Sequence, residues 1–429
     1  MALGAAHDPE LARRAGQALG RDLRIFGFNM NLAPVLDVNS NPDNPVIGIR
    51  SFGEHADQVA ALGIAYVDGM QSEGVLAVAK HFPGHGDTDT DSHYHLPILP
   101  HDRQRLDEVE LYPFAKGFSE GLDAIMTAHI ALPALASPDD AERNLPATLN
   151  PRVLTGILRD ELSYDGLVIT DGLEMQGIIA RFGAGEAAVR AINAGADVVM
   201  VLWYPENKRE VRDALLAAVQ SGRIPQWRFD QAVRRVLVAK AKRGIFGRAL
   251  IPEKEALAEL RKADRSVVAE IAERAITIVK NDAVLPLTSA KKIAVASTEP
   301  LFAELLAKKV GAKTVALQLE PTRERTAADA QKLVDIARDA DVVVIGMETL
   351  DHRAIVERVK QQLPQARIVV VSFASPYLLS RLPPVDAYVC AFGWREDSER
   401  AAALAMTNEL QATGTLPVTL ATTTKAAQK

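Results

Sequence analysis

Over the first 250 residues, apolar runs of strand length alternate with segments in which apolar residues recur at helical spacing. The strand-like runs occupy residues 28–38, 75–82, 124–132, 166–171 and 197–203. Near-continuous apolar strands between amphipathic helices are typical of a parallel sheet covered by helices. The pattern predicts a (β/α)8-type barrel of the TIM kind. A closed barrel needs eight such units and only five are recognisable, so we expect the barrel to lack its first strands.

The remaining chain shows a second alternating pattern after a break. We expect residues 1–250 to form the barrel, residues 251–272 a linker and helix, and residues 273–429 a C-terminal α/β sandwich domain. The strand-like runs of that last part lie at residues 275–280, 291–297, 314–319, 341–347, 367–373 and 386–394. Helical segments separate most of them, so the predicted fold class is α/β throughout, with an open sheet in the second domain.

The amino-acid composition argues against several classes of protein. The 429 residues carry a net charge of −6, and 48% of them are hydrophobic, which is typical of a soluble globular chain. The negative charge argues against a nucleic-acid partner. The single cysteine, Cys390, excludes an internal disulfide framework and a cysteine-based zinc site.

The chain offers no sign of a membrane partner. No apolar run reaches the roughly 18–20 residues of a membrane span. The first residues do not resemble a signal peptide, which favours the cytoplasm for the chain as given. A longer natural N-terminus would permit export, so the compartment stays unknown, and so does the oligomeric state.

The loop KHFPGHGDTDTDSHYHLP, residues 80–97, is rich in side chains that can transfer protons or bind a metal ion. It holds four histidines and three aspartates after a predicted strand. Three interpretations compete: a solvated polar loop, a zinc or manganese site, and acid–base catalysis. A calcium loop is excluded because Ser92 and Ile98 stand where glycine and glutamate are needed.

Acid–base catalysis needs a proton-transfer residue and, for double displacement, a nucleophile. Asp91 and His93 lie two residues apart, so the carboxylate could orient the imidazole and stabilise its protonated form. Asp171 ends the strand-like run 166–171 and is the candidate nucleophile. Its alternative role is that of a helix N-cap. Because the carboxyl ends of parallel strands form the active face, we expect Asp37, Lys80–His81, His129 and Asp171 to converge.

Three segments resemble glycoside hydrolase family 3, in its β-N-acetylglucosaminidase branch. They are the loop at residues 80–97, NLAPVLDVNSNPDNPVIGIRSFG at residues 31–53 and YDGLVITDGLEMQGI at residues 164–178. The resemblance continues at residues 273–287, which are similar to the opening of that family's C-terminal sandwich. It implies a retaining exo-glycosidase that releases terminal β-linked N-acetylglucosamine from a small carbohydrate or cell-wall fragment, without metal or cofactor.

The resemblance also implies roles for single residues. Asp171 would be the nucleophile, and His93 paired with Asp91 would be the acid and then the base. Arg50, Lys80 and His81 would bind sugar hydroxyls.

Two further candidates for substrate binding follow from position alone. His129, near the end of the run 124–132, lines the site or is a hydrogen-bonded core histidine. Trp203 ends the last barrel strand and could stack on a sugar face.

The sequence departs from the family pattern at two points. Gly172 follows Asp171, where a second aspartate is common. An Asp-Gln-Glu-Gly-Gly-like strand and a following arginine, which bind sugar in the family, are expected upstream of Met1. Three alternatives therefore stay open: a β-glucosidase on the same fold, a catalytically impaired fragment, and a metal-dependent hydrolase that uses the His/Asp loop.

Overall fold

The computed structural model describes residues 1–92, 94–135, 144–247, 249–261 and 265–420. Contacts divide the chain into two compact units. We call residues 9–264 the N-terminal unit, and residues 265–429 together with residues 1–8 the C-terminal unit. The expected boundaries differ from this division mainly in the first eight residues, which the sequence assigns to the barrel.

The N-terminal unit contains a parallel sheet, which within the described residues has five strands in chain order. The strands are β1 (Met30–Asn31), β2 (Leu76–Phe82), β3 (Ala124–Thr127), β4 (Leu167–Gly172) and β5 (Val198–Met200). Val78 pairs with Ala124, Ala124 with Leu167, and Ile169 with Val198. The in-order parallel arrangement places the carboxyl ends of neighbouring strands side by side, as the predicted active face requires.

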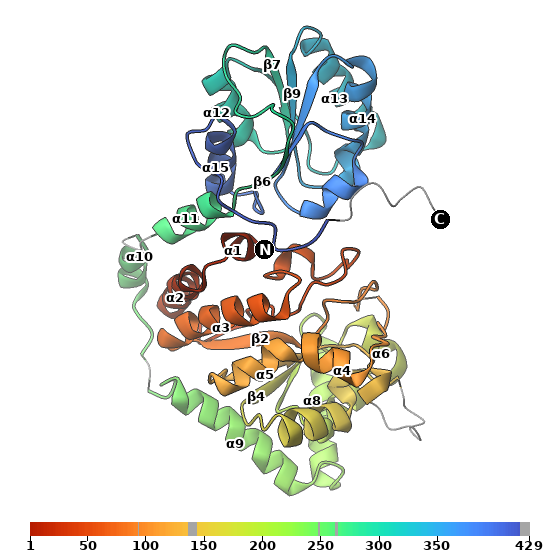
Figure 1. Cartoon of the computed structure of the whole chain (residues 1–429). Helices are drawn as coiled ribbons and strands as arrows, with labels where there is room; N and C mark the ends of the chain where they lie inside the picture. Colours follow the sequence, from red (N-terminus) through yellow and green to blue (C-terminus); the bar gives the residue numbers. More distant parts are fainter. Residues whose placement is uncertain (93, 136–143, 248, 262–264, 421–429) are drawn as a thin grey trace. The chain divides into compact units, whose positions relative to one another are not determined.

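Helices connect these strands and pack outside the sheet (Figure 1). The α-helices of more than one turn are α2 (Pro9–Ile25), α3 (Ala56–Ser72), α5 (Tyr112–Ser119), α6 (Gln176–Phe182), α7 (Ala184–Ala194), α8 (Pro205–Gln220), α9 (Gln226–Lys242) and α10 (Glu253–Arg261). Further helical segments are η1 (Gly48–Arg50), α4 (Arg103–Arg105), η2 (Leu106–Glu110), η3 (Pro133–Leu135), η4 (Ala147–Leu149) and η5 (Arg152–Glu161). Helix α2 begins at Pro9, where a proline at the first helical position is favoured because its missing N–H has no partner to lose.

Both faces of the central strands are buried. In β2, β3 and β4 the two alternating sets of side chains are almost all inaccessible, which explains the continuous apolar runs in the sequence. Strand β1 is shorter than the predicted run 28–38. Pro34 lies inside that run and has no N–H for a ladder hydrogen bond, and a single bridge between Val35 and Lys80 follows it.

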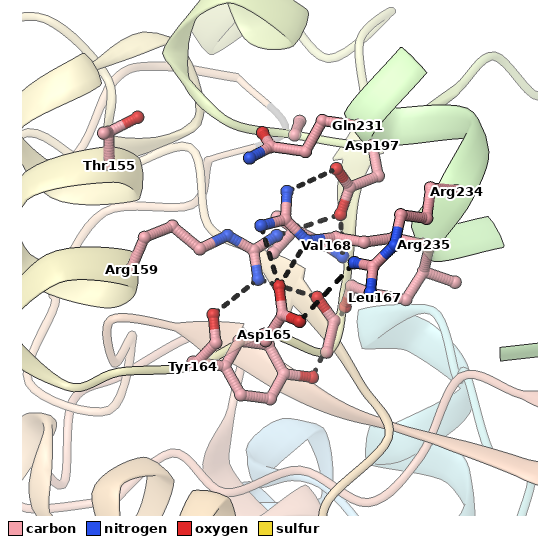
Figure 2. Close-up of polar contacts among 12 residues, drawn as sticks. Thr155, Arg159, Tyr164, Asp165, Leu167, Val168, Asp197, Gln231, Arg234 and Arg235 are labelled. Atoms are coloured by element: carbon pink, nitrogen blue, oxygen red, sulfur yellow. Dashed lines mark hydrogen bonds and ion pairs between the residues drawn. The ribbon is translucent and has the colours of Figure 1, made fainter. Parts of the chain in front are cut away.

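A cluster of buried arginines lies at the amino end of β5 (Figure 2). The Asp197 carboxylate, with a fully buried side chain, accepts hydrogen bonds from Arg159 (2.9 Å), Arg228 (3.0 Å) and Arg235 (3.4 Å). It also accepts the backbone N–H of Val168 at 3.0 Å. This cluster fixes the edge of the sheet opposite the carboxyl ends of the strands.

The C-terminal unit is an open six-stranded sheet in order β6-β11-β10-β9-β7-β8, counted within the described residues. Its strands are β6 (Thr277–Asn281), β7 (Ile293–Ser297), β8 (Lys313–Ala316), β9 (Val342–Met347), β10 (Arg367–Ser372) and β11 (Ala387–Cys390). Only β6 runs antiparallel to its neighbour. Each strand lies within or next to a predicted strand-like run.

Helices cover both faces of this sheet, α12 and α15 on one and α13 and α14 on the other (Figure 1). The helical elements are α1 (Ala2–Ala6), α11 (Ser266–Ala275), α12 (Pro300–Val310), α13 (Arg323–Ile336), η6 (Leu350–His352), α14 (Arg353–Gln362), η7 (Pro376–Arg381) and α15 (Glu396–Met406). Helix α1 belongs here because Asp8 pairs with Arg274 at 2.7 Å and Ala5 accepts the N–H of Thr415 at 3.0 Å. Among the described residues, no helix has the length and apolar character needed to cross a membrane.

Candidate active site

Asp171 lies near the carboxyl end of β4, with a partly buried side chain. Its Oδ1 accepts the backbone N–H of Gly172 at 2.7 Å. Burial alone would raise the pKa of Asp171. The charges of His129, His81 and Lys80 and the Gly172 hydrogen bond outweigh burial and hold that pKa below its usual range. The carboxylate is therefore ionised at neutral pH, as a nucleophile must be.

His81, in β2, is oriented by a second buried aspartate. Its Nδ1 lies 2.7 Å from Oδ2 of Asp37. A carboxylate can only accept, so Nδ1 carries the proton and donates it. The other Asp37 oxygen accepts the backbone N–H groups of His81 (3.1 Å) and His85 (2.7 Å). Asp37 thus leaves Nε2 of His81 as the nitrogen available to a ligand.

Lys80 and Arg50 bring positive charge to the same site. Burial and the nearby Arg50 charge lower the pKa of Lys80, while Asp171 and Asp37 act in the opposite direction. Lys80 is therefore within electrostatic range of Arg50 and of both aspartates. Arg50, at the end of η1, is exposed and donates to the Val46 carbonyl at 3.1 Å. The structure thus places Lys80 within electrostatic range of Arg50, and His81 and Lys80 within electrostatic range of Asp171; that these residues bind sugar stays a prediction from the resemblance.

His129 lies just after β3 and is almost completely buried. Its Nε2 lies 2.9 Å from the Gly172 carbonyl, so this nitrogen donates, and its Nδ1 lies 2.8 Å from the Thr148 hydroxyl. Its charge also lowers the pKa of Asp171. Of the two roles considered for His129, these contacts favour the hydrogen-bonded core residue, one that supports the Asp171–Gly172 backbone.

The loop at residues 80–97 is held by a neutral histidine. His85 Nδ1 lies 2.8 Å from Oγ1 of Thr88, and Nε2 lies 3.0 Å from Oγ of Ser92. The Thr88 hydroxyl donates its proton to the His85 carbonyl at 3.2 Å. Nδ1 must therefore be the donor, and Nε2 accepts from Ser92. Burial lowers the pKa of His85 to about 4, which keeps the ring neutral.

Asn44, which lies outside the loop at residues 80–97, is hydrogen-bonded to it. Its Nδ2 donates to the His85 carbonyl at 2.8 Å and to the Gly86 carbonyl at 3.0 Å. The sequence did not single out Asn44 or the His85 contacts, because nothing in the local pattern says which loop groups meet.

The predicted acid–base dyad lies further along the loop. Asp91 occupies a turn, in which its carbonyl accepts the N–H groups of Tyr94 (3.0 Å) and His95 (3.1 Å). His93 lies outside the described residues. The pairing of His93 with Asp91 stays a prediction from the sequence.

Trp203 follows β5 and lies beside the nucleophile segment. Its side chain is 51% exposed. A Cβ placed on Gly172 would lie 3.6 Å from the Trp203 ring, so the indole packs against the residue that follows Asp171. The structure thereby brings a solvent-exposed aromatic ring to the carboxyl ends of β4 and β5.

One group of side chains could hold a metal ion. Ligand atoms of Asp87, His101 and Glu110 all lie within 4.8 Å of one another. Arg105 donates to Asp87 at 3.5 Å and to Glu110 at 3.3 Å, and His101 lies 2.6 Å from Asp87. Because the Arg105 guanidinium already supplies positive charge to both carboxylates, the group is explained as an ion-pair network that anchors Asp87 of the loop.

Residues 1–239 match the N-terminal domain of glycosyl hydrolase family 3. The chain belongs to glycosyl hydrolase family 3. This confirms the resemblance drawn from the loop at residues 80–97. Beta-hexosaminidase A of Pseudoalteromonas piscicida is 37% identical over 304 residues, which cover 67% of this chain and 50% of that protein. A Cellulomonas fimi relative named beta-N-acetylglucosaminidase/beta-glucosidase is 34% identical over 294 residues, covering 67% of this chain and 52% of its own length.

Solved structures agree with the fold of this family 3 chain. A family 3 β-N-acetylglucosaminidase from Paenibacillus sp. str. FPU-7 superposes with a TM-score of 0.87 at 38% identity, covering 98% of this chain and 82% of that one. The predicted α/β fold class, a barrel-type sheet followed by a sandwich domain, is confirmed. The chain spans about half the length of the curated relatives it matches.

Proposed function

We propose that this family 3 chain is a retaining exo-glycosidase that hydrolyses terminal β-linked N-acetylglucosamine. The observation that carries the proposal is the ionised Asp171 at the carboxyl end of β4, close to three basic side chains and next to an exposed tryptophan. The names of relatives that match about two thirds of this chain support the choice of sugar.

In the proposed reaction, Asp171 attacks the anomeric carbon and forms a covalent glycosyl-enzyme, while the leaving oxygen takes a proton from His93. His93, supported by Asp91, then removes a proton from water, and the hydroxide releases the sugar with retained configuration. Lys80, His81 and Arg50 would hold sugar hydroxyls by hydrogen bonds. Asp171 starts ionised, because its pKa is lowered, and positive charge nearby stabilises that form.

Small cell-wall fragments are the proposed natural substrates, and nothing in the mechanism requires a metal or an organic cofactor. A β-glucosidase activity is the second candidate, because one matching relative carries both activities in its name. Comparison of nitrophenyl N-acetyl-β-glucosaminide with nitrophenyl β-glucoside separates the two. We expect kcat/KM to favour the acetylated sugar.

The decisive experiment traps the covalent intermediate. A 2-substituted fluoro-sugar should label the peptide that carries Asp171, as mass spectrometry of the digested protein would reveal. Labelling of another carboxylate would contradict the assignment. A folded but inactive chain would favour the impaired fragment, and activity that a chelator removes would favour the metal-dependent alternative.

A further inference from the structure

A buried glutamate lies three residues beyond the proposed nucleophile and binds the loop that carries Trp203. The Glu174 side chain is 5% exposed. One of its oxygens accepts the backbone N–H groups of Leu202 (2.6 Å) and Trp203 (2.8 Å). The other accepts the N–H of Tyr204 at 2.8 Å and Nδ2 of Asn207 at 3.2 Å.

These four contacts rule out a catalytic role for the Glu174 carboxylate. Each oxygen already accepts two hydrogen bonds, and the group is shielded from solvent. Burial raises the pKa of Glu174, but the hydrogen bonds from the loop outweigh burial and hold that pKa below its usual range. A buried carboxylate whose two oxygens each accept two hydrogen bonds is suited to holding structure and unsuited to transferring protons.

The loop that Glu174 holds has an unusual surface. Leu202, Trp203 and Tyr204 are consecutive and 44%, 51% and 55% exposed, so three large apolar side chains face solvent beside the site. The backbone is neither helix nor strand here, so its N–H groups need partners outside regular secondary structure. Glu174 supplies all three, which fixes the backbone while leaving the side chains open.

We propose that Glu174 is a positioning residue that holds residues 202–204 as a platform, with Trp203 against Gly172, for the apolar C–H face of a bound sugar. The inference rests on the proposed function, since a sugar must occupy the site next to Asp171. Aromatic rings offer a flat apolar face that complements the C–H groups of a pyranose. Glu174 would then set substrate affinity through Trp203 without contacting the substrate.

The kinetic test uses the full chain and nitrophenyl N-acetyl-β-glucosaminide. Trp203→Ala and Glu174→Ala should each raise KM about three- to tenfold and leave kcat within about twofold, because stacking contributes on the order of 1 kcal/mol. The double variant should be no worse than Trp203→Ala, since both changes remove one interaction. Additive effects, or a loss in kcat at unchanged KM, would overturn the proposal.

Matched variants separate positioning from charge and from folding. Glu174→Gln keeps the shape and one accepting oxygen, so its KM should fall between those of the wild type and Glu174→Ala. Glu206→Ala removes an exposed glutamate from the first turn of α8, close to the same loop, and should leave KM unchanged. An equal rise in KM in Glu206→Ala and Glu174→Ala would contradict a specific role.

A second measurement is independent of turnover. In a Trp227→Phe/Trp394→Phe background, fluorescence reports Trp203 alone, because the chain has three tryptophans. Glu174→Ala should increase acrylamide quenching of Trp203, whereas Glu206→Ala should not. If the wild type hydrolyses no glycoside, the proposed function fails, and N-acetylglucosamine titration followed by Trp203 fluorescence still tests the platform. Unchanged quenching in Glu174→Ala would overturn the inference whatever the activity.

Discussion

Two aspartates in or beside strands of the same sheet, the partly buried Asp171 and the buried Asp197, have opposite surroundings. Asp197 lies at the amino end of β5 and accepts hydrogen bonds from three arginines and one backbone N–H (Figure 2). Within the described residues, the Asp171 carboxylate accepts one hydrogen bond, from Gly172, although basic groups surround it. A carboxylate whose oxygens are all occupied by hydrogen-bond donors holds structure. A carboxylate that is stabilised mainly by nearby positive charge, with few donors, keeps oxygen lone pairs for reaction.

The largest effect is expected at the nucleophile. Asp171→Asn should lower kcat/KM for nitrophenyl N-acetyl-β-glucosaminide by about 10⁴-fold or more, as removal of an essential catalytic group does. The amide is nearly isosteric, so the far-UV circular dichroism and the thermal midpoint should stay close to those of the wild type. Substantial residual activity that survives repurification would refute the role of Asp171.

At Asp197, in contrast, the main effect is expected on stability. Asp197→Ala leaves three arginines without their shared carboxylate, so the free energy of unfolding should fall by about 3–5 kcal/mol. Urea unfolding measures this change. Asp165→Ala is the control: Asp165 pairs with Arg235 at 2.9 Å, but its side chain is 70% exposed, so its loss should cost about 1 kcal/mol or less. Equal costs at both positions would contradict the contrast between buried and exposed pairs.

A smaller effect on stability, one that depends on pH, is expected at His85. Its pKa is about 4 in the fold and about 6.5 when unfolded. The unfolded chain therefore binds the extra proton first as pH falls. The contribution of neutral His85 to stability should be intact above pH 6.5 and decline by about 1.4 kcal/mol per pH unit towards pH 4.

His85→Gln provides the comparison. The wild-type free energy of unfolding should fall more steeply than that of His85→Gln between pH 6.5 and pH 4. Ser92→Ala retains the histidine and should retain the steep dependence. Parallel curves for the wild type and His85→Gln would show that His85 does not titrate on unfolding.

The smallest effect is expected at Gly172. A Cβ there would lie 3.6 Å from the side chains of Leu202 and Trp203, which is ordinary contact distance. Gly172→Ala should therefore change kcat/KM by about twofold or less. The free energy of unfolding should change by about 0.5 kcal/mol or less. A large loss would mean that the sugar needs the space above this glycine.

The sequence predicted the strands of both sheets because each is an apolar run between helical segments. It also predicted that Lys80, His81 and Asp171 lie near one another, since residues at the carboxyl ends of neighbouring parallel strands share one edge, and the charges of His81 and Lys80 do act on Asp171. The predicted strand 28–38 was too long because the apolar pattern continues past Asn31, where β1 ends, and through Pro34, which has no N–H for a ladder hydrogen bond. His93 and Asp91 as a dyad remain a prediction.

Tertiary structure decided what each side chain does at that edge. Asp37 and His81 are 44 residues apart, and Glu174 lies about 30 residues before the loop it holds, so no local pattern relates them. The sequence contains Asp171 and Asp197 as two similar aspartates beside apolar strands. Their different chemistry comes from the donors that folding brings to each: arginines from η5 and α9 at the amino end of β5, and two histidines and a lysine at the carboxyl end of β4. Apolar periodicity indicates which segments form strands, but hydrogen bonding between distant segments fixes which carboxylate is saturated and which is left reactive.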